Sequence, residues 1–284
     1  MERYKNREEI AILMTTYNGG AYLPEQIESL INQSFSSWRL FIHDDGSSDN
    51  TLEIIHNYEL MDNRIVLVND MEKHLGACRG FMYLLSIIDS ELYMFCDQDD
   101  VWLNDKISLS VDEYKAVYEP GRPIVVHTDM SVVDSSLKIM AESYWRGINL
   151  DPDKINSLPY LYVCCYTNGN TMLFNKIAKN CCFPLAEDMG MHDLYVSSCV
   201  MKNNGIVHAT HKSTVLYRQH GRNVCGVSVG KELFLINKLK SIGHVLSTNY
   251  RFYKSYHRRG CGNILNFIKY KALVEIHMHY KNNY

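Results

Sequence analysis

The sequence predicts an α/β fold built from parallel βαβ units. Four short apolar runs, each bounded by polar turn residues, lie within the first hundred residues and have the pattern of buried strands. Segments with apolar residues at helical spacing separate these runs, an alternation typical of parallel sheets. The composition, 46% hydrophobic and 21% charged over 284 residues, is ample for a packed core and excludes a disordered or low-complexity chain.

The predicted strands are runs rich in Ile, Val, Leu and Phe that end at turn or polar residues. They cover residues 10–15, 38–42, 65–68, 92–96, 124–126, 171–174, 205–208 and 214–217. Polar side chains follow each of the first four strands directly. Open α/β sheets bind ligands outside the carboxyl ends of their strands, so the sequence places the candidate site at that edge.

The predicted helices rest on apolar spacing and on start signals. They cover residues 22–33, 51–58, 78–88, 105–118 and 193–201. Pro24 lies near the start of the first helix, Ser48 or Asp49 can cap the second, and Gly76 precedes the third. Residues 131–163 are less periodic, and no internal repeat is present.

Charge is distributed unevenly along the chain. Residues 231–284 hold ten Lys or Arg and two acidic residues, a net charge of +8, which leaves −11 on the first 230 residues for a total of −3. The pattern of this segment is mainly helical, with a break near Gly260. We therefore expect one globular domain over residues 1–226, followed by a helical, basic and aromatic-rich extension over 227–284.

Cysteine usage and the N-terminus indicate a cytoplasmic protein. The nine cysteines are odd in number, include the adjacent pairs Cys164–Cys165 and Cys181–Cys182, and form no C-x-x-C motif, so we expect reduced thiols. The first nine residues are too charged for a signal peptide, and no run approaches the roughly 18 apolar residues of a spanning helix. Peripheral binding to the inner face of the cytoplasmic membrane is compatible with these features.

An acidic cluster follows the strand at 92–96. Asp97, Asp99 and Asp100 place three carboxylates within four positions, where they repel one another unless a cation is present. Oxygen ligands on a loop suit Mg²⁺ or Mn²⁺, which usually keep coordination positions for water and substrate phosphates. The alternative is a solvated acidic turn that caps the next helix.

Other polar residues have both a chemical and a structural interpretation. Asp44 and Asp45 can accept hydrogen bonds from a base or ribose, or they can form an Asx turn and helix cap. Asp193, at a predicted helix start, can act as a general base or as an N-cap. His220 can ligate a metal or serve structurally, and Arg218 can bind phosphate oxygens or be a surface charge.

The C-terminal segment alternates basic and aromatic residues. Its members are Lys238, Lys240, Arg251, Lys254, Arg258, Arg259, Lys269 and Lys271, with Phe252, Tyr253, Tyr256, Phe267 and Tyr270. This pattern favours an anionic membrane surface, and the alternative is a solvated helical face with a packed apolar stripe. We expect no nucleic-acid partner, because no recognition motif accompanies the basic residues.

The order of several motifs resembles one known family. The motifs are the segments 12–18, Asp44-Asp-Gly-Ser-Ser-Asp-Asn-Thr51, Asp97-Gln-Asp-Asp-Val-Trp102, His127-Thr-Asp129, Thr167-Asn-Gly169, Phe174-Asn175, Met191-His-Asp193 and Tyr217-Arg-Gln-His-Gly221. Over residues 9–226 this set is similar to family 2 inverting glycosyltransferases of the GT-A fold, and in particular to the rhamnosyltransferase-like bacterial subgroup of surface-polysaccharide assembly. The resemblance implies a Rossmann-like, mixed and mostly parallel sheet. The nucleotide-sugar half would cover about 9–129, and the acceptor half about 130–226.

The resemblance also implies roles for individual residues. Asp193 falls at the position of the family's catalytic base, Asp97 and Asp99 match its DXD element, and Asp99 and His220 would bind the Mn²⁺ or Mg²⁺ cofactor. The residues implied in binding the nucleotide sugar are Thr15, Tyr17, Asn18, Asp44, Asp45, Arg79, Asp97, Gln98 and Arg218. One departure concerns the segment after the third strand, where the family's Asn-x-Gly is replaced by Lys73-His-Leu-Gly76 and Arg79 keeps the basic role.

The implied reaction is transfer of a sugar from a nucleoside diphosphate to an acceptor hydroxyl with inversion. Asp193 would take the hydroxyl proton, and the charge of the leaving diphosphate would be stabilised by the metal and by Arg79 or Arg218. The subgroup favours deoxythymidine-diphosphate rhamnose as the donor, with uridine-diphosphate hexoses next, and a lipid-linked or oligosaccharide acceptor.

Two other functions remain as alternatives. A nucleotidyltransferase would need a basic residue in a Gly-rich stretch after the first strand, which Tyr17-Asn-Gly-Gly-Ala21 does not supply. A catalytically inactive module that binds nucleotide or glycan would not need Asp97, Asp99, Asp193 and His220 together. Release of free nucleoside diphosphate in the presence of an acceptor separates the enzyme from the binding module.

Overall fold

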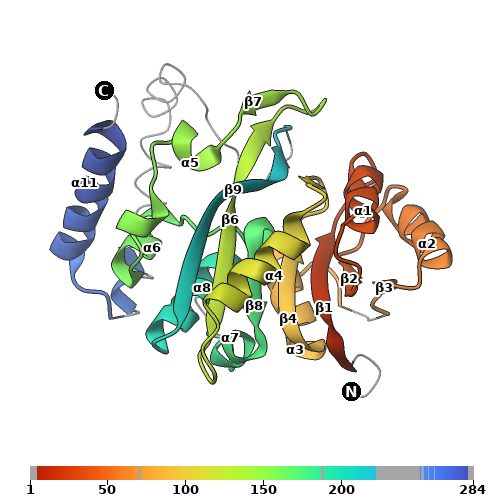
Figure 1. Cartoon of the computed structure of the whole chain (residues 1–284), viewed down its shortest axis with the longest axis horizontal. Helices are drawn as coiled ribbons and strands as arrows, with labels where there is room; N and C mark the ends of the chain where they lie inside the picture. Colours follow the sequence, from red (N-terminus) through yellow and green to blue (C-terminus); the bar gives the residue numbers. More distant parts are fainter. Residues whose placement is uncertain are drawn as a thin grey trace. The chain divides into compact units, whose positions relative to one another are not determined.

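The structure is a computed structural model of the whole chain, shown in Figure 1. It describes residues 5–69, 72–186, 189–221, 250, 253–254, 256–258 and 260–280. The predicted domain boundary after 226 lies outside the described residues. So do Lys238, Lys240, Arg251, Phe252 and Arg259 of the basic segment.

The described chain contains alternating strands and helices in its N-terminal part, as predicted. The strands are β1 (Lys5–Thr16), β2 (Trp38–Asp44), β3 (Ile65–Leu67), β4 (Asp89–Cys96), β5 (Val101–Trp102), β6 (Ile124–Val133), β7 (Ile139–Ala141), β8 (Met172–Asn175) and β9 (Ile206–Arg218). The α-helices are α1 (Leu23–Ile31), α2 (Thr51–Met61), α3 (Ala77–Ile87), α4 (Lys106–Ala116), α5 (Tyr144–Gly147), α6 (Leu158–Cys164), α7 (Lys176–Cys181), α8 (His192–Lys202) and α11 (Ile264–Tyr280). Two 3₁₀ turns, η2 (Pro152–Lys154) and η3 (Gly169–Thr171), complete the described elements.

The strands form one mixed sheet in the order β3-β2-β1-β4-β8-β6-β9-β5, with β7 paired to β6. β1 pairs in parallel with both β2 and β4, and β2 pairs in parallel with β3. β8 runs antiparallel to both β4 and β6, and β5 runs antiparallel to β9. The prediction of a mixed sheet flanked by helices is confirmed, and its parallel pairs lie in the N-terminal part.

The chain divides into two compact units. The first joins the residues up to Asp129 to Thr167–Leu216, and the second joins Met130–Tyr166 to the residues from Tyr217 onward. No helix among the described residues combines the length and the apolar character needed to cross a bilayer.

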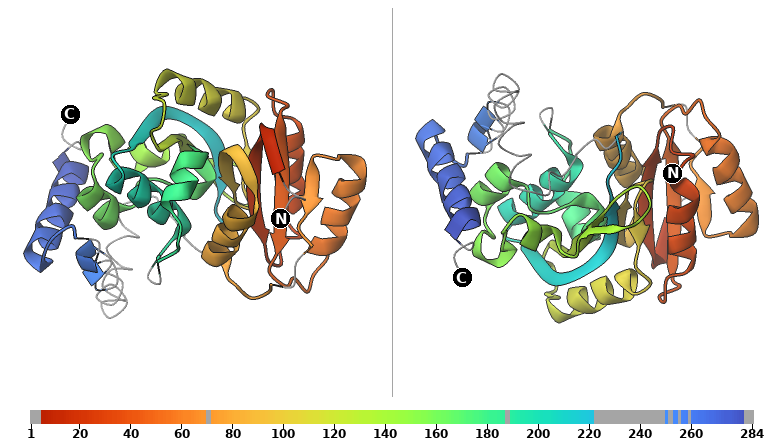
Figure 2. Two further views of the ribbon diagram at one scale, coloured as in Figure 1. Left: turned by 90° about the horizontal axis from the view of Figure 1, so that it is seen from below. Right: turned by 90° about the horizontal axis from the view of Figure 1, so that it is seen from above.

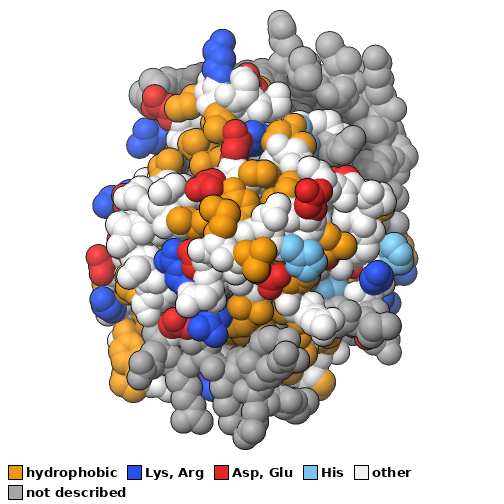
Figure 3. Space-filling view, turned by 90° about the vertical axis from the view of Figure 1, so that its right-hand side faces the viewer, with side chains coloured by type: hydrophobic (Ala, Val, Ile, Leu, Met, Phe, Trp, Pro, Cys, Tyr) orange, Lys and Arg blue, Asp and Glu red, His pale blue; other side chains and the backbone are white. Residues whose placement is uncertain are grey.

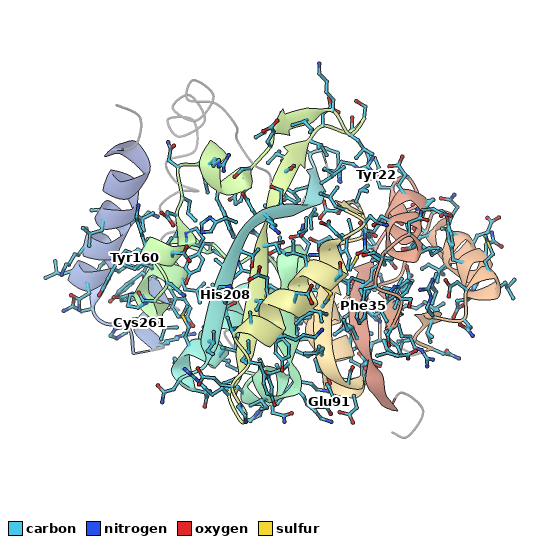
Figure 4. The ribbon with its side chains drawn as sticks, viewed as in Figure 1. Tyr22, Phe35, Glu91, Tyr160, His208 and Cys261 are labelled. Atoms are coloured by element: carbon cyan, nitrogen blue, oxygen red, sulfur yellow. The ribbon has the colours of Figure 1, made fainter. Side chains whose placement is uncertain are left out.

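The core of the first unit lies between the central strands and the helices that cover them. Leu13 of β1, Phe95 of β4 and Phe81 of α3 belong to one cluster of fully buried side chains, which Val200 of α8 joins. Each such side chain contributes about 1.5–3 kcal/mol by leaving water. In both views of Figure 2, α4 lies along β9. His208 of β9, labelled in Figure 4, meets Glu113 of α4 with 3.1 Å between Nε2 and Oε2.

Several strands are longer than predicted: β1 and β4 begin before residues 10 and 92, and β6 and β9 continue through polar residues. The strand predicted over 124–126 continues through His127-Thr-Asp129 to Val133, because neighbouring elements bury these polar side chains along with the apolar ones. The two strands predicted at 205–208 and 214–217 are one strand, β9. The polar residues in the middle of this strand led to the prediction of a loop. In the structure the backbone stays extended there, and the side chains of His211 and Lys212 are exposed to solvent.

The second unit contains α6 and α11 packed against each other. The rings of Tyr160 on α6 and Tyr270 on α11 meet edge to face with 5.0 Å between centroids, and Figure 4 labels Tyr160 at this contact. Phe267 and Val274 of α11 are buried. The predicted helical character of the C-terminal segment is confirmed for Ile264–Tyr280.

Candidate active site

The carboxyl ends of the parallel strands bring together three segments that are distant in sequence. In the sheet register, Thr16 of β1 pairs with Asp44 of β2, and Met14 of β1 pairs with Cys96 of β4. The residues that follow these strands therefore leave the same edge of the sheet side by side. The acidic cluster from Asp97 lies beside the segment from Tyr17 because of this register, as the strand pattern predicts.

Hydrogen bonds of the Gln98 and Asn18 side chains connect these loops to one another. The backbone N–H of Tyr17 donates to Gln98 Oε1 at 3.0 Å, and Gln98 Nε2 donates back to the Tyr17 carbonyl at 3.2 Å. Asn18 Oδ1 accepts from the Ser48 N–H at 2.8 Å, which links the first loop to the loop after β2. The Tyr17 side chain is 53% exposed, so its ring is accessible to a ligand.

Asp44 organises the turn after β2. Its Oδ1 accepts the N–H groups of Gly46 at 3.1 Å and Ser47 at 2.8 Å, and its Oδ2 accepts the Thr16 hydroxyl at 2.9 Å. Gly46 has a φ of +95°, which favours glycine in this turn. Asp44 thus has the Asx-turn role that the sequence left open beside ligand binding.

Asp45 holds the loop that leads into α3. Its two carboxylate oxygens accept the N–H of Leu75 at 2.6 Å and of Gly76 at 2.9 Å, and the residue is buried. This is the segment whose sequence departs from the family pattern. Arg79 follows on α3 and is exposed. Thr15 packs against the same helix, because a Cβ at Gly80 would lie 2.6 Å from Thr15 Oγ1.

The acidic cluster after β4 places carboxylates close enough together for their charges to repel one another. Burial raises the pKa of Asp97 well above its ordinary value, and the charges of Asp100, Asp99 and Asp193 raise that pKa further. Asp97 and Asp99 are half-buried, whereas Asp100 is fully buried. Carboxylate oxygens are the ligand type that a divalent cation such as Mg²⁺ or Mn²⁺ prefers, and the metal role of Asp99 stays a prediction.

Asp193 lies in the first turn of α8 with its carboxylate held on both oxygens. The Gly169 N–H donates to Oδ2 at 3.2 Å, and the Leu194 N–H donates to Oδ1 at 2.7 Å. The N-terminus of a helix favours a negative charge at this position. Because the charge of Asp193 acts on both Asp97 and the Cys78 thiol, residues 97 and 193 lie within electrostatic reach of each other.

Arg218 and His220 belong to the second unit. Arg218, at the end of β9, is buried, and its Nη1 donates to the Ser135 carbonyl at 3.1 Å. His220 follows β9 and is partly exposed. The phosphate role of Arg218 and the metal role of His220 stay predictions.

Several residues near the acidic groups are not predicted as site residues from the sequence. Asn170 donates to Asp100 with 2.5 Å between Nδ2 and Oδ2. Lys106 is fully buried in α4, with Nζ 4.6 Å from the Trp102 ring centroid. His192 is buried beside Asp193 and stacks on Phe81 at 4.3 Å between ring centroids. In the sequence, Asn170 directly follows the motif Thr167-Asn-Gly169 and His192 lies within Met191-His-Asp193, whereas Lys106 has no comparable signal.

Comparison with known proteins assigns this chain to a class of enzyme, the glycosyltransferases. Residues 11–151 match the model of glycosyl transferase family 2. The dTDP-rhamnosyl transferase RfbG of Shigella flexneri is 29% identical over 254 residues, 84% of this chain and 81% of the relative. The UDP-Glc:alpha-D-GlcNAc-diphosphoundecaprenol beta-1,3-glucosyltransferase WfgD of Escherichia coli is 24% identical over 69% of this chain and 71% of that protein.

A solved structure has the same fold. The mannosyltransferase PcManGT of Pyrobaculum calidifontis, in complex with GDP-Man and Mn²⁺, superimposes with a TM-score of 0.57 at 16% identity, over 98% of this chain and 71% of its own. Residues 11–151 are therefore a glycosyl transferase family 2 domain, and the chain is a glycosyltransferase with the GT-A fold. Its relatives connect it to polysaccharide biosynthesis.

Proposed function

We propose that the protein is an inverting, divalent-metal-dependent glycosyltransferase. It would move a sugar from a nucleoside diphosphate to a hydroxyl of a lipid-linked glycan during surface-polysaccharide assembly. We favour dTDP-rhamnose as donor, with UDP-hexoses next. The name and 29% identity of RfbG support the rhamnosyl donor, and the name of WfgD supports a diphosphoundecaprenol-linked acceptor.

The observation that carries the proposal is the closeness of the held Asp193 carboxylate to Asp97, whose pKa it raises. A carboxylate fixed on both oxygens, within electrostatic reach of Asp97, suits a general base beside a diphosphate site. In the proposed reaction Asp193 accepts the proton of the acceptor hydroxyl. The hydroxyl oxygen forms a bond to the anomeric carbon, and the bond from that carbon to the phosphate oxygen breaks with its electron pair on the leaving diphosphate.

The chain's own residues would bind and orient the donor. The Tyr17 ring and the loops held by Asp44 and Asp45 would receive the nucleoside, and Asp97 and Asp99 would hold the metal. Bound Mn²⁺ or Mg²⁺ supplies charge neutralisation of the departing diphosphate. The exposed Arg79 guanidinium would add a positive charge to the same group.

Substitution of Asp193 by Asn tests the assignment of the base. The change removes the proton acceptor but keeps the shape, so kcat should fall by about 10²–10⁴-fold while donor affinity stays within about threefold. Transfer is measured as nucleoside diphosphate released in the presence of acceptor, and donor affinity by titration calorimetry. Near-wild-type kcat in the variant would remove Asp193 from this role. Donor binding without acceptor-dependent release in the wild type would favour the binding module.

We also propose that α11 binds an anionic membrane surface, where a lipid-linked acceptor resides. Ile264, Leu265 and Ile268 are 50%, 71% and 55% exposed, although the same helix buries Phe267 against the second unit. Lys269, exposed on the same helix, accompanies this apolar face. The segment 250–274 holds six Lys or Arg and no acidic residue, which complements anionic headgroups.

Vesicle sedimentation tests the membrane proposal. Wild-type protein should bind vesicles that contain phosphatidylglycerol more than neutral ones, and binding should weaken with salt. Ile264→Ser/Ile268→Ser should reduce this binding. The matched control is Leu60→Ser/Met61→Ser on α2, whose side chains are 88% and 74% exposed. The first unit does not present a uniformly basic surface on the face that Figure 3 views, because acidic and basic side chains are interspersed there. Equal loss in both variants would contradict the assignment to α11.

A further inference from the structure

The η3 turn contacts the Asp193 carboxylate directly. Asp193 Oδ1 is held by the N–H of Leu194 in its own helix, whereas Oδ2 is held by the N–H of Gly169 in the turn. The direction of the carboxylate therefore depends on two elements that meet only in the folded chain. A shift of the turn would release Oδ2 and leave the helix contact intact.

A buried hydrogen bond fastens the turn to the acidic edge of the sheet. Asn170 Nδ2 donates to Asp100 Oδ2 at 2.5 Å, and the two side chains are 3% and 0% exposed. Asp100 directly follows Asp99, the predicted metal ligand. Loss of either partner of a buried hydrogen bond leaves the other without it, at a cost greater than the net gain from forming the bond.

The imidazole of His192 packs against Gly169 of the turn. A Cβ at Gly169 would lie 2.5 Å from His192 Nε2, so the ring occupies the space that any larger residue would need. The ring is fixed by Phe81, stacked at 4.3 Å, and by Phe95, edge-on at 4.9 Å between centroids. Within the described part of the chain, neither His192 ring nitrogen has a hydrogen-bond partner.

We propose that the η3 turn is a positioning element for the Asp193 carboxylate, and that Gly169 and Asn170 are its positioning residues. Gly169 supplies the N–H that orients Oδ2 and leaves room for His192. Asn170 ties the turn to Asp100, and so couples the orientation of the base to the loop that carries the acidic cluster. This inference rests on the proposed role of Asp193 as general base.

Exchange of the two partners of the buried bond provides the sharpest test. Asn170→Asp alone opposes two carboxylates at a 2.5 Å contact, and it should lower kcat at least about tenfold while donor affinity stays within about threefold, since misplacement of a reacting group by 1 Å can cost about 100-fold. Asp100→Asn/Asn170→Asp restores one amide and one carboxylate with unchanged net charge. This double variant should recover most of the lost kcat.

Substitution of the glycine gives a second, independent test. Gly169→Ala should lower kcat with little change in donor affinity, because the new methyl group meets His192 and displaces the N–H from Oδ2. The matched control is Gly147→Ala, where the added Cβ would meet only Ala141 Cβ at an ordinary 3.8 Å. Thermal unfolding of each variant verifies that the chain is folded.

Hydrogen exchange measures the positioning without reference to activity. The Gly169 amide should exchange faster in Asn170→Asp than in the wild type, and the exchange should slow again in the double variant. Faster exchange with lowered kcat supports the proposal. Unchanged Gly169 exchange in Asn170→Asp, or a double variant no better than the single one in both exchange and kcat, would overturn it. If Asp193→Asn transfers sugar as fast as the wild type, the proposed base is wrong, and the exchange result still decides whether Asn170 holds the turn.

Discussion

Because of Lys106, we expect the stability of the first unit to change with pH in the alkaline range. Its side chain is fully buried, and Nζ has no hydrogen-bond partner within the described residues, with the Trp102 ring centroid at 4.6 Å. Burial lowers the pKa of Lys106 from 10.5 to about 7, although the charges of Cys96 and Asp100 oppose the shift. The protonated amine is therefore less favourable in the folded chain than in the unfolded chain.

The sign and size of the effect follow from proton binding. Between pH 7 and 10.5 the unfolded chain keeps the Lys106 proton and the folded chain has released it. Unfolding then takes up a proton, so Lys106 makes the free energy of unfolding rise with pH by at most about 1.4 kcal/mol per unit. Below pH 7 both states are protonated and the full cost of burial is present. Above pH 10.5 that cost is gone.

Urea unfolding of the wild type and of Lys106→Met at pH 7, 8 and 9 measures this contribution. Methionine does not titrate, so the variant lacks this pH dependence. The unfolding free energy of the wild type minus that of the variant should therefore increase by about 1 kcal/mol or more for each pH unit. Lys115→Met is the matched control, since solvent reaches that side chain, 70% exposed, in the folded chain as well. A difference that stays constant from pH 7 to 9 would refute the reasoning.

Three further substitutions test the loops around the acidic edge. Asp99→Asn should abolish the increase in donor affinity that Mn²⁺ produces while metal-free affinity stays unchanged, as measured by calorimetry with and without the ion. Asp45→Asn removes one of the two oxygens that accept the Leu75 and Gly76 amides, and the loss of a charged hydrogen bond costs about 1.5–3 kcal/mol. We expect donor binding to weaken about tenfold while kcat stays nearly constant. Gly80→Ala should lower the free energy of unfolding by about 1–3 kcal/mol in urea titrations, because its Cβ would lie 2.6 Å from Thr15 Oγ1.

The strands of the first unit are predictable because their signals are local. The apolar run Ile10–Met14 is fully buried in the middle of the sheet, and the polar residues that follow each strand mark the edge with the site. The extent of β9 is not predictable in this way. Whether Thr210–Ser213 forms a loop or an extended strand depends on the neighbouring strands that accept its backbone bonds, and these are distant in sequence.

The residues of the candidate site are likewise predictable from the sequence only where their signals are local. Asp97 and Asp99 are visible in the sequence because three carboxylates follow one strand, whereas Asp193 is linked to them only through the family resemblance. The bond between Asn170 and Asp100 joins positions 70 residues apart, so no local pattern contains it. Lys106 resembles an ordinary exposed helix-start lysine in the sequence. Lysine is among the residues least often buried without a partner, and only the packing of α4 reveals the exception.

The hydrogen bonds of Asp44 and Asp45 change how a nucleoside-binding role for these residues should be understood. Both carboxylates already accept backbone N–H groups, Asp44 from its own turn and Asp45 from Leu75 and Gly76. A base or ribose would therefore use the lone pairs that remain, in directions fixed by the existing bonds. The same bonds hold the segment before Arg79 in place although it lacks the family's Asn. In the proposed donor site, the backbone of that loop, held by Asp45, would take the place of the missing side chain.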